Sequence, residues 1–156
     1  MSLGKIERLV LIDDSAVDQH LYRRMILRSG RVEEVISFRL AEDALAYLFA
    51  ADTPEPDLIL LDVSMPTMDG FEFLDALKAR FGNRDFSIVV MLTTSLNLAD
   101  TDRAAETLAV KDYLNKPLTA RRLDELITWA WRSKQTPRYQ GPHIKIVPKI
   151  SVGAVD

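Results

Sequence analysis

Three acidic residues stand at the ends of two short apolar runs. Asp13 and Asp14 follow the run 10–12, and Asp62 follows the run 58–61. If both runs are parallel strands, the three carboxylates meet at the carboxyl edge of one sheet, where open α/β sheets bind their ligands. Crowded like charges repel, and a bound divalent cation with oxygen ligands relieves that repulsion. The pattern therefore predicts a site for a hard metal ion around Asp62.

Two further polar residues lie at or beside the ends of later predicted strands. Thr93 would supply a hydroxyl donor, and Lys116 would neutralise a transferred anion. Pro117 favours an extended backbone at the residue before it, which keeps Lys116 on its strand. A carboxylate is ionised at neutral pH, so Asp62 needs no general base to attack phosphorus. Carboxylates, hydroxyl and lysine together describe a phosphoryl-binding site.

Short apolar runs alternate with longer helical patterns along the chain. This alternation is typical of repeated βα units, which form a parallel sheet covered by helices on both faces. We expect five units, with strands at about 8–13, 34–38, 58–62, 87–93 and 112–115. The third and fourth runs are almost wholly apolar, as buried central strands are.

Capping and breaking residues delimit the helices expected between these strands. Ser15 and Gly30 are expected to start and stop the first helix. In the last helix, a core stripe recurs at helical spacing, and Trp129 is expected to point well away from it. The remaining helices are expected at about 41–51, after Asp69-Gly70 as far as Gly82, and at about 98–108, and the fifth starts after Thr119.

Composition excludes several classes of protein. The 156 residues are enough for one domain and a tail, and the 47% apolar and 28% charged fractions are those of a soluble globular chain. We expect no membrane span and no secretory signal. With no cysteine, a cytoplasmic setting fits. The net charge of −3 argues against a nucleic-acid partner.

Four segments, in this order and spacing, resemble the receiver domain of two-component response regulators over about residues 8–134. They are 11–15 (LIDDS), 61–70 (LDVSMPTMDG), 91–95 (MLTTS) and 112–117 (DYLNKP). The resemblance implies a flavodoxin-like, doubly wound (βα)5 fold with strand order 2-1-3-4-5, in a single-domain, chemotaxis-regulator-like form. Residues 1–134 would form the receiver domain, and 135–156 a tail without an output domain.

The resemblance also assigns roles to the site residues. Asp62 would be the phosphoacceptor, Thr93 would hydrogen-bond the acyl phosphate, and Lys116 would pair with it. Tyr113 matches an aromatic position that moves inward on phosphorylation, and it is equally compatible with a plain core role. The Mg²⁺ ligands would be Asp13, Asp14, Asp62 and the backbone carbonyl of Ser64.

The favoured function is a phosphorylation switch rather than an enzyme with an external substrate. It would take a phosphoryl group from a sensor histidine kinase or phosphotransfer protein and signal through protein contacts, with no membrane partner. One alternative is an aspartyl-nucleophile phosphatase, although Ser64 stands where that chemistry usually needs a second aspartate. Another is a flavodoxin-like cofactor binder, which the acidic cluster disfavours. Trp129 either packs under the tail or marks a dimer surface.

Overall fold

The computed structural model of the chain describes residues 4–81, 88–93, 112–115 and 118–135, and for residues 88, 93 and 112–115 it describes the backbone alone. The elements, in chain order, are β1 (Ile6–Ile12), α1 (Ala16–Ser29), β2 (Val32–Phe38), α2 (Ala41–Phe49), β3 (Leu58–Asp62), α3 (Gly70–Phe81), β4 (Ile88–Thr93), β5 (Asp112–Asn115) and α5 (Ala120–Lys134). The helix expected at 98–108 and the expected tail from 136 onward lie outside the described residues.

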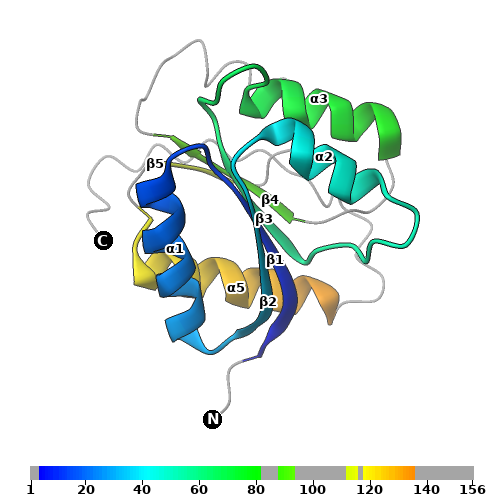
Figure 1. Cartoon of the computed structure of the whole chain (residues 1–156). Coiled ribbons are helices and arrows are strands. Elements are labelled where there is room, and N and C mark those ends of the chain that lie inside the picture. The colour runs from blue at the N-terminus through cyan, green and yellow to red at the C-terminus, as the bar shows by residue number, and fades with distance from the viewer. Residues whose placement is uncertain (1–3, 82–87, 94–111, 116–117, 136–156) are drawn as a thin grey trace.

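A parallel sheet with the order β2-β1-β3-β4-β5 forms the middle layer of the fold. Helices α1 and α5 cover one face of this sheet, and α2 and α3 cover the other (Figure 1). The α/β class and the expected strand order agree with this arrangement. Since the strands are parallel, their carboxyl ends all lie at one edge.

Alternate residues of the central strands feed two separate cores. Val10 and Ile59 belong to the core under α2 and α3, whereas Leu9 and Leu60 belong to the core under α1 and α5. All five residues of β3 are buried. This burial on both faces explains why the run 58–61 carries no polar residue before Asp62.

The ends of α1 are those that the sequence predicts. The hydroxyl of Ser15 accepts a hydrogen bond from the Asp18 N–H at 3.2 Å, and Gly30 ends the helix with φ 66° while its N–H donates to the Leu27 carbonyl at 3.3 Å. An open left-handed position of this kind favours glycine, because a Cβ there crowds the following carbonyl.

We expect Gly30→Ala to lower the free energy of unfolding by about 1 kcal/mol. No atom lies within 4 Å of a Cβ built at Gly30, so the cost comes from the backbone conformation alone. Urea denaturation followed by circular dichroism measures it. A variant as stable as the wild type would show that the helix end adopts another conformation at no cost.

Helix α5 buries the stripe predicted for it. Thr119 caps the helix by accepting a hydrogen bond from the Arg122 N–H at 3.1 Å. Leu123 and Ile127, within the stripe, are fully buried in the core shared with α1. Trp129 is partly buried and packs against this core, so the expectation that it points well away from the stripe is wrong.

An arginine that the sequence analysis did not single out joins three parts of the α1–α5 side. The buried guanidinium of Arg31 donates to the Gly4 carbonyl at 2.9 Å and to the Asp124 carboxylate at 2.6 Å. The indole of Trp131 lies so close to Gly4 that a Cβ there would overlap it. The described start of the chain is thereby fixed against α5.

Among the described helices, none combines the length and the apolar character that crossing a membrane requires.

Candidate metal centre

The structure brings the three predicted acidic residues together. Asp13 and Asp14 follow β1, Asp62 ends β3, and the two strands are neighbours with Ile12 paired to Leu61. One carboxylate oxygen from each of the three acids lies within 4.8 Å of the other two. Asp13 is 1% exposed and Asp62 is 7% exposed, while Asp14 is half-buried. Three negative charges therefore share a site with little access to water.

This donor set fits a hard divalent cation. Mg²⁺ prefers oxygen ligands at about 2.0–2.1 Å in an octahedron, which places neighbouring ligand oxygens roughly 3 Å apart and opposite ones roughly 4 Å apart. The three carboxylate oxygens lie within 4.8 Å of one another, close enough for one cation to be shared by all three side chains. Without a cation, the carboxylates repel one another.

Asp13 is held by contacts on both its side chain and its backbone. Its carboxylate accepts a hydrogen bond from the Ser15 N–H at 2.9 Å, and its own N–H donates to the Phe38 carbonyl at 3.0 Å. The amide of Gln19, a buried polar residue of α1, donates to the carbonyls of Asp13 (2.9 Å) and Phe38 (2.8 Å). The sequence analysis missed Gln19, because nothing in the sequence marks this glutamine of α1 as buried.

The loop from β3 to α3 is fixed by backbone contacts at both ends. The Val63 N–H donates to the Leu92 carbonyl at 3.1 Å, and the Gly70 N–H donates to the Val63 carbonyl at 2.9 Å. Asp69 and Glu72 form reciprocal hydrogen bonds at the start of α3, as in a capping box. These contacts fix where the loop leaves β3 and where it enters α3.

Thr67, in the same loop, has a left-handed backbone with φ 64°, which costs a residue with a Cβ about 1–2 kcal/mol. Its hydroxyl lies 2.5 Å from a carboxylate oxygen of Glu42, in the first turn of α2. This hydrogen bond, with a backbone one at Glu42, lowers the pKa of the Glu42 carboxyl, and desolvation opposes the shift. The contact links α2 to the loop beside the acidic cluster.

A shallow hollow of about 550 Å³ opens beside the acidic cluster. Asp14 lines one side of it, and the β3–α3 loop with Phe71 of α3 lines the other. Ser64 is exposed in this lining, two residues after Asp62. A group of phosphate size can therefore reach the edge of the site from solvent.

The structure places only part of the remaining predicted site. Thr93 ends β4, directly after Leu92, which pairs with Asp62, so its backbone lies at the same sheet edge. Tyr113 belongs to the neighbouring β5. The side chains of Thr93 and Tyr113, and the whole of Lys116, lie outside the described part of the structure.

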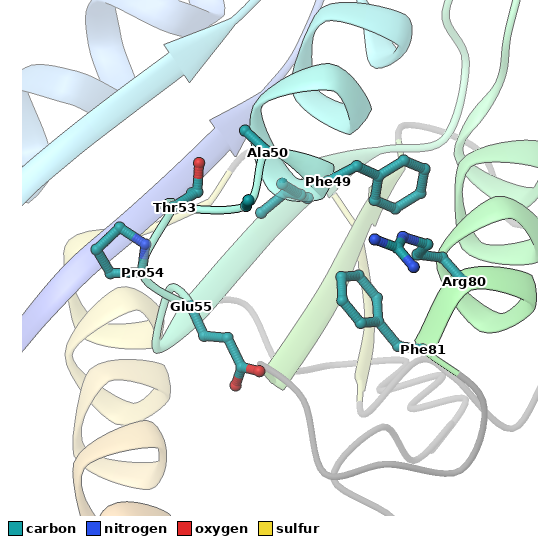
Figure 2. Close-up of a pocket in the computed structure, with 9 residues that line it drawn as sticks. Phe49, Ala50, Thr53, Pro54, Glu55, Arg80 and Phe81 are labelled. Atoms are coloured by element: carbon teal, nitrogen blue, oxygen red, sulfur yellow. The ribbon is translucent and has the colours of Figure 1, made fainter.

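A second hollow, of about 310 Å³, lies at the amino end of β3, where α2 and α3 finish (Figure 2). Phe49 of α2 and Phe81 of α3 meet edge to face with 5.7 Å between ring centroids, and the Arg80 guanidinium lies 5.8 Å from the Phe49 ring. The lining includes Glu55 but no cluster of acids. Its composition does not favour metal or phosphoryl chemistry.

Comparison with known proteins decides the family. The family described as response regulator receiver domain matches residues 9–128, a range that contains the whole acidic cluster. The chain belongs to this family. The resemblance drawn from the four sequence segments is thereby confirmed.

The curated relatives of this receiver domain are longer proteins. It is 32% identical over 120 residues to the protein-glutamate methylesterase/protein-glutamine glutaminase of Nitrobacter winogradskyi, covering 76% of this chain and 27% of the relative. It is 31% identical over 105 residues to hybrid signal transduction histidine kinase D of Dictyostelium discoideum, covering 65% of this chain and 7% of that protein. The chain thus spans well under half the length of these relatives.

Solved receiver structures match this receiver domain over nearly their whole length. A two-component response regulator from Cytophaga hutchinsonii is 33% identical with a TM-score of 0.74, covering 82% of this chain and 98% of that one. The phosphorylated cyanobacterial phytochrome response regulator is 28% identical with a TM-score of 0.67, covering 85% and 98%. The receiver fold of the chain is therefore established independently of the sequence motifs.

Proposed function

We propose that this receiver domain is a switch that accepts a phosphoryl group on Asp62. The observation that carries the proposal is the acidic cluster, in which carboxylate oxygens of Asp13, Asp14 and Asp62 lie within 4.8 Å of one another at the edge where parallel sheets bind ligands. These three residues and the Ser64 carbonyl would hold Mg²⁺. Family membership supports this assignment, because receiver domains generally use this metal.

In the proposed reaction, a carboxylate oxygen of Asp62 attacks the phosphorus atom of a phosphohistidine. A phosphorus–oxygen bond forms, and the bond from phosphorus to the imidazole nitrogen breaks with its electron pair on the nitrogen. When bound, Mg²⁺ neutralises charge on the transferred group. Thr93 would donate a hydrogen bond to the acyl phosphate, and Lys116 would pair with its charge.

The proposed donor is a sensor histidine kinase or a phosphotransfer protein. Membership of the receiver family and the match to a hybrid histidine kinase support this class of partner. The phosphoryl group adds roughly −1.5 to −2 charges at the sheet edge, which favours a conformation that places Thr93 near it. Tyr113 would follow Thr93, and the changed surface would be read by another protein.

The boundaries and setting of the switch belong to the same proposal. Residues 1–134 would act as the receiver, and 135–156 as a tail. The only chemistry would be the domain's own phosphorylation and dephosphorylation, in the cytoplasm. Ser64 disfavours the phosphatase alternative, and the carboxylates around Asp62 disfavour a flavin phosphate.

Acetyl phosphate tests the proposal directly. Incubating the protein with acetyl phosphate and Mg²⁺ is expected to add one phosphoryl group, seen by intact mass spectrometry, and chelating the metal with EDTA is expected to prevent the addition. The reason is that charge on the transferred group is left unneutralised without the cation. Equal phosphorylation in EDTA, or no adduct at high acetyl phosphate, would contradict the proposal.

A further inference from the structure

The junction between β2 and α2 touches the loop after β1, which carries Asp13 and Asp14, and the loop after β3, which begins directly after Asp62. Arg39 donates from Nε (3.3 Å) and Nη2 (3.1 Å) to the backbone carbonyl of Asp14, in the loop after β1. Three residues later, Glu42 accepts the hydrogen bond from Thr67, in the loop after β3. Two oppositely charged side chains of one short segment therefore reach opposite sides of the same site.

We propose that Arg39 and Glu42 are positioning residues, which hold the loop after β1 and the loop after β3 at the separation that the metal requires. This inference rests on the proposed function, since it assumes that the acidic cluster binds Mg²⁺. Neither residue touches the reacting atoms. We call the pair, with its contacts to Asp14 and Thr67, the brace.

The need for a brace follows from the charges in the site. Asp13 and Asp14 lie in the loop after β1, and Asp62 is the last residue of β3, directly before the second loop, so repulsion among their carboxylates tends to separate these two segments when no cation is bound. Contacts from a third segment to both loops oppose that separation. They keep the carboxylates near one another before the metal arrives.

The segment that carries the brace is itself fixed to the sheet. The Phe38 carbonyl, directly before Arg39, accepts hydrogen bonds from the Asp13 N–H at 3.0 Å and from the Gln19 amide at 2.8 Å. Leu40, the N-cap of α2, provides no side-chain cap. The acidic Glu42 is favoured by the helix dipole in this first turn, where it also receives the Thr67 hydroxyl.

The Thr67 hydroxyl has one hydrogen and two acceptors within reach. The Pro66 carbonyl of its own loop lies at 2.6 Å, and the Glu42 carboxylate lies at 2.5 Å. The charged acceptor forms the stronger hydrogen bond. Thr67 also has a left-handed backbone that threonine seldom adopts, so the conformation of the loop depends on what holds this residue.

Magnesium affinity, measured by calorimetry on the unphosphorylated protein, tests the brace. Thr67→Val removes the hydroxyl while preserving the shape, and Glu42→Ala removes its acceptor. Each is expected to raise the Kd for Mg²⁺ by roughly three- to tenfold, the size expected for one lost hydrogen bond. The double variant is expected to be no weaker than either single variant, because both changes break one contact.

Arg39→Ala separates positioning from simple electrostatics. Removing a positive charge near the carboxylates would by itself strengthen Mg²⁺ binding. Loss of the contact to Asp14 is instead expected to raise the Kd for Mg²⁺ by roughly threefold or more. A raised Kd supports the brace. An unchanged or lowered Kd overturns the role of Arg39.

Two control variants exclude trivial explanations. Asp43→Ala removes a neighbouring exposed acid from the same helical turn, and it is expected to leave the Kd unchanged. Thr67→Ser preserves the hydroxyl and is expected to bind Mg²⁺ like the wild type. Carbon-detected NMR supplies a second readout, because the pKa of Glu42 is expected to rise in Thr67→Val, where its hydrogen-bond donor is gone.

The outcomes distinguish this inference from the proposed function. A wild-type protein that does not bind Mg²⁺ contradicts both. A wild type that binds Mg²⁺, with Thr67→Val and Glu42→Ala binding equally well, overturns the brace alone. Equal weakening by Asp43→Ala also overturns it, since net charge would then account for the effect.

Discussion

Asp62→Asn is expected to abolish phosphorylation by acetyl phosphate. The amide that replaces the carboxylate is neutral, so no anionic oxygen remains to attack phosphorus, and one of the three carboxylates proposed to hold the metal is lost. Intact mass spectrometry after incubation with acetyl phosphate and Mg²⁺ measures the loss. Peptide mapping of the wild type is expected to locate the phosphoryl group at position 62.

The same substitution is expected to stabilise the metal-free protein. Asp62 is 7% exposed and shares its site with two other carboxylates, so neutralising it removes repulsion that the folded state alone experiences. We expect a gain of about 1 kcal/mol in the free energy of unfolding, measured in EDTA.

Asp75→Asn is the matched control for both effects. It makes the same chemical change at an exposed position of α3, and it is expected to alter neither phosphorylation nor stability. A phosphoryl adduct that persists in Asp62→Asn would contradict the assigned phosphoacceptor. Metal-free Asp62→Asn less stable than the wild type would contradict the repulsion argument.

The acidic cluster could be predicted from sequence because the acids stand at the ends of two buried apolar runs. Parallel strands turn such positions, distant in the chain, into neighbours, as the pairing of Ile12 with Leu61 shows. Helix ends at Ser15 and Gly30 were also predictable, since their signals are local. Features that depend on strand ends and helix caps can therefore be predicted without a structure.

The contacts that support the cluster could not be predicted in this way. Thr67 and Glu42 are 25 residues apart, both are exposed, and neither residue type is unusual in its segment. Gln19 is distinguished by burial, which only the packed structure reveals. Trp129 was misplaced because helical spacing gives a direction but not the width of the surface that the helix covers. The Thr67–Glu42 contact, the burial of Gln19 and the position of Trp129 all depend on tertiary packing.

Gly70 shows the same limit at a position where the consequence is large. The sequence placed it directly before the third helix, whereas it is the first residue of α3, and its closeness to Asp62 was not predicted. A Cβ built at Gly70 would lie 2.8 Å from the Asp62 carbonyl oxygen, 2.9 Å from Met91 Cε and 3.1 Å from Val63 Cα. Met91 has a flexible end that can shift, whereas the other two atoms belong to the backbone beside the site.

Gly70→Ala is therefore expected to lower the free energy of unfolding by about 1–3 kcal/mol, in spite of alanine's higher helix propensity. Because relief of the clash moves the backbone of Asp62, the rate of phosphorylation by acetyl phosphate is expected to fall by about ten- to a hundredfold. Denaturation curves and a time course of adduct formation measure the two effects.

Gly30→Ala is the control that separates these effects, since it is a glycine-to-alanine change in open space, far along the chain from the β3–α3 loop. It is expected to cost stability while leaving the phosphorylation rate unchanged. If Gly70→Ala loses stability to the same extent and still phosphorylates at the wild-type rate, Met91 alone absorbs the added methyl group. The close approach of α3 to Asp62 would then contribute to folding but not to the geometry of phosphoryl transfer.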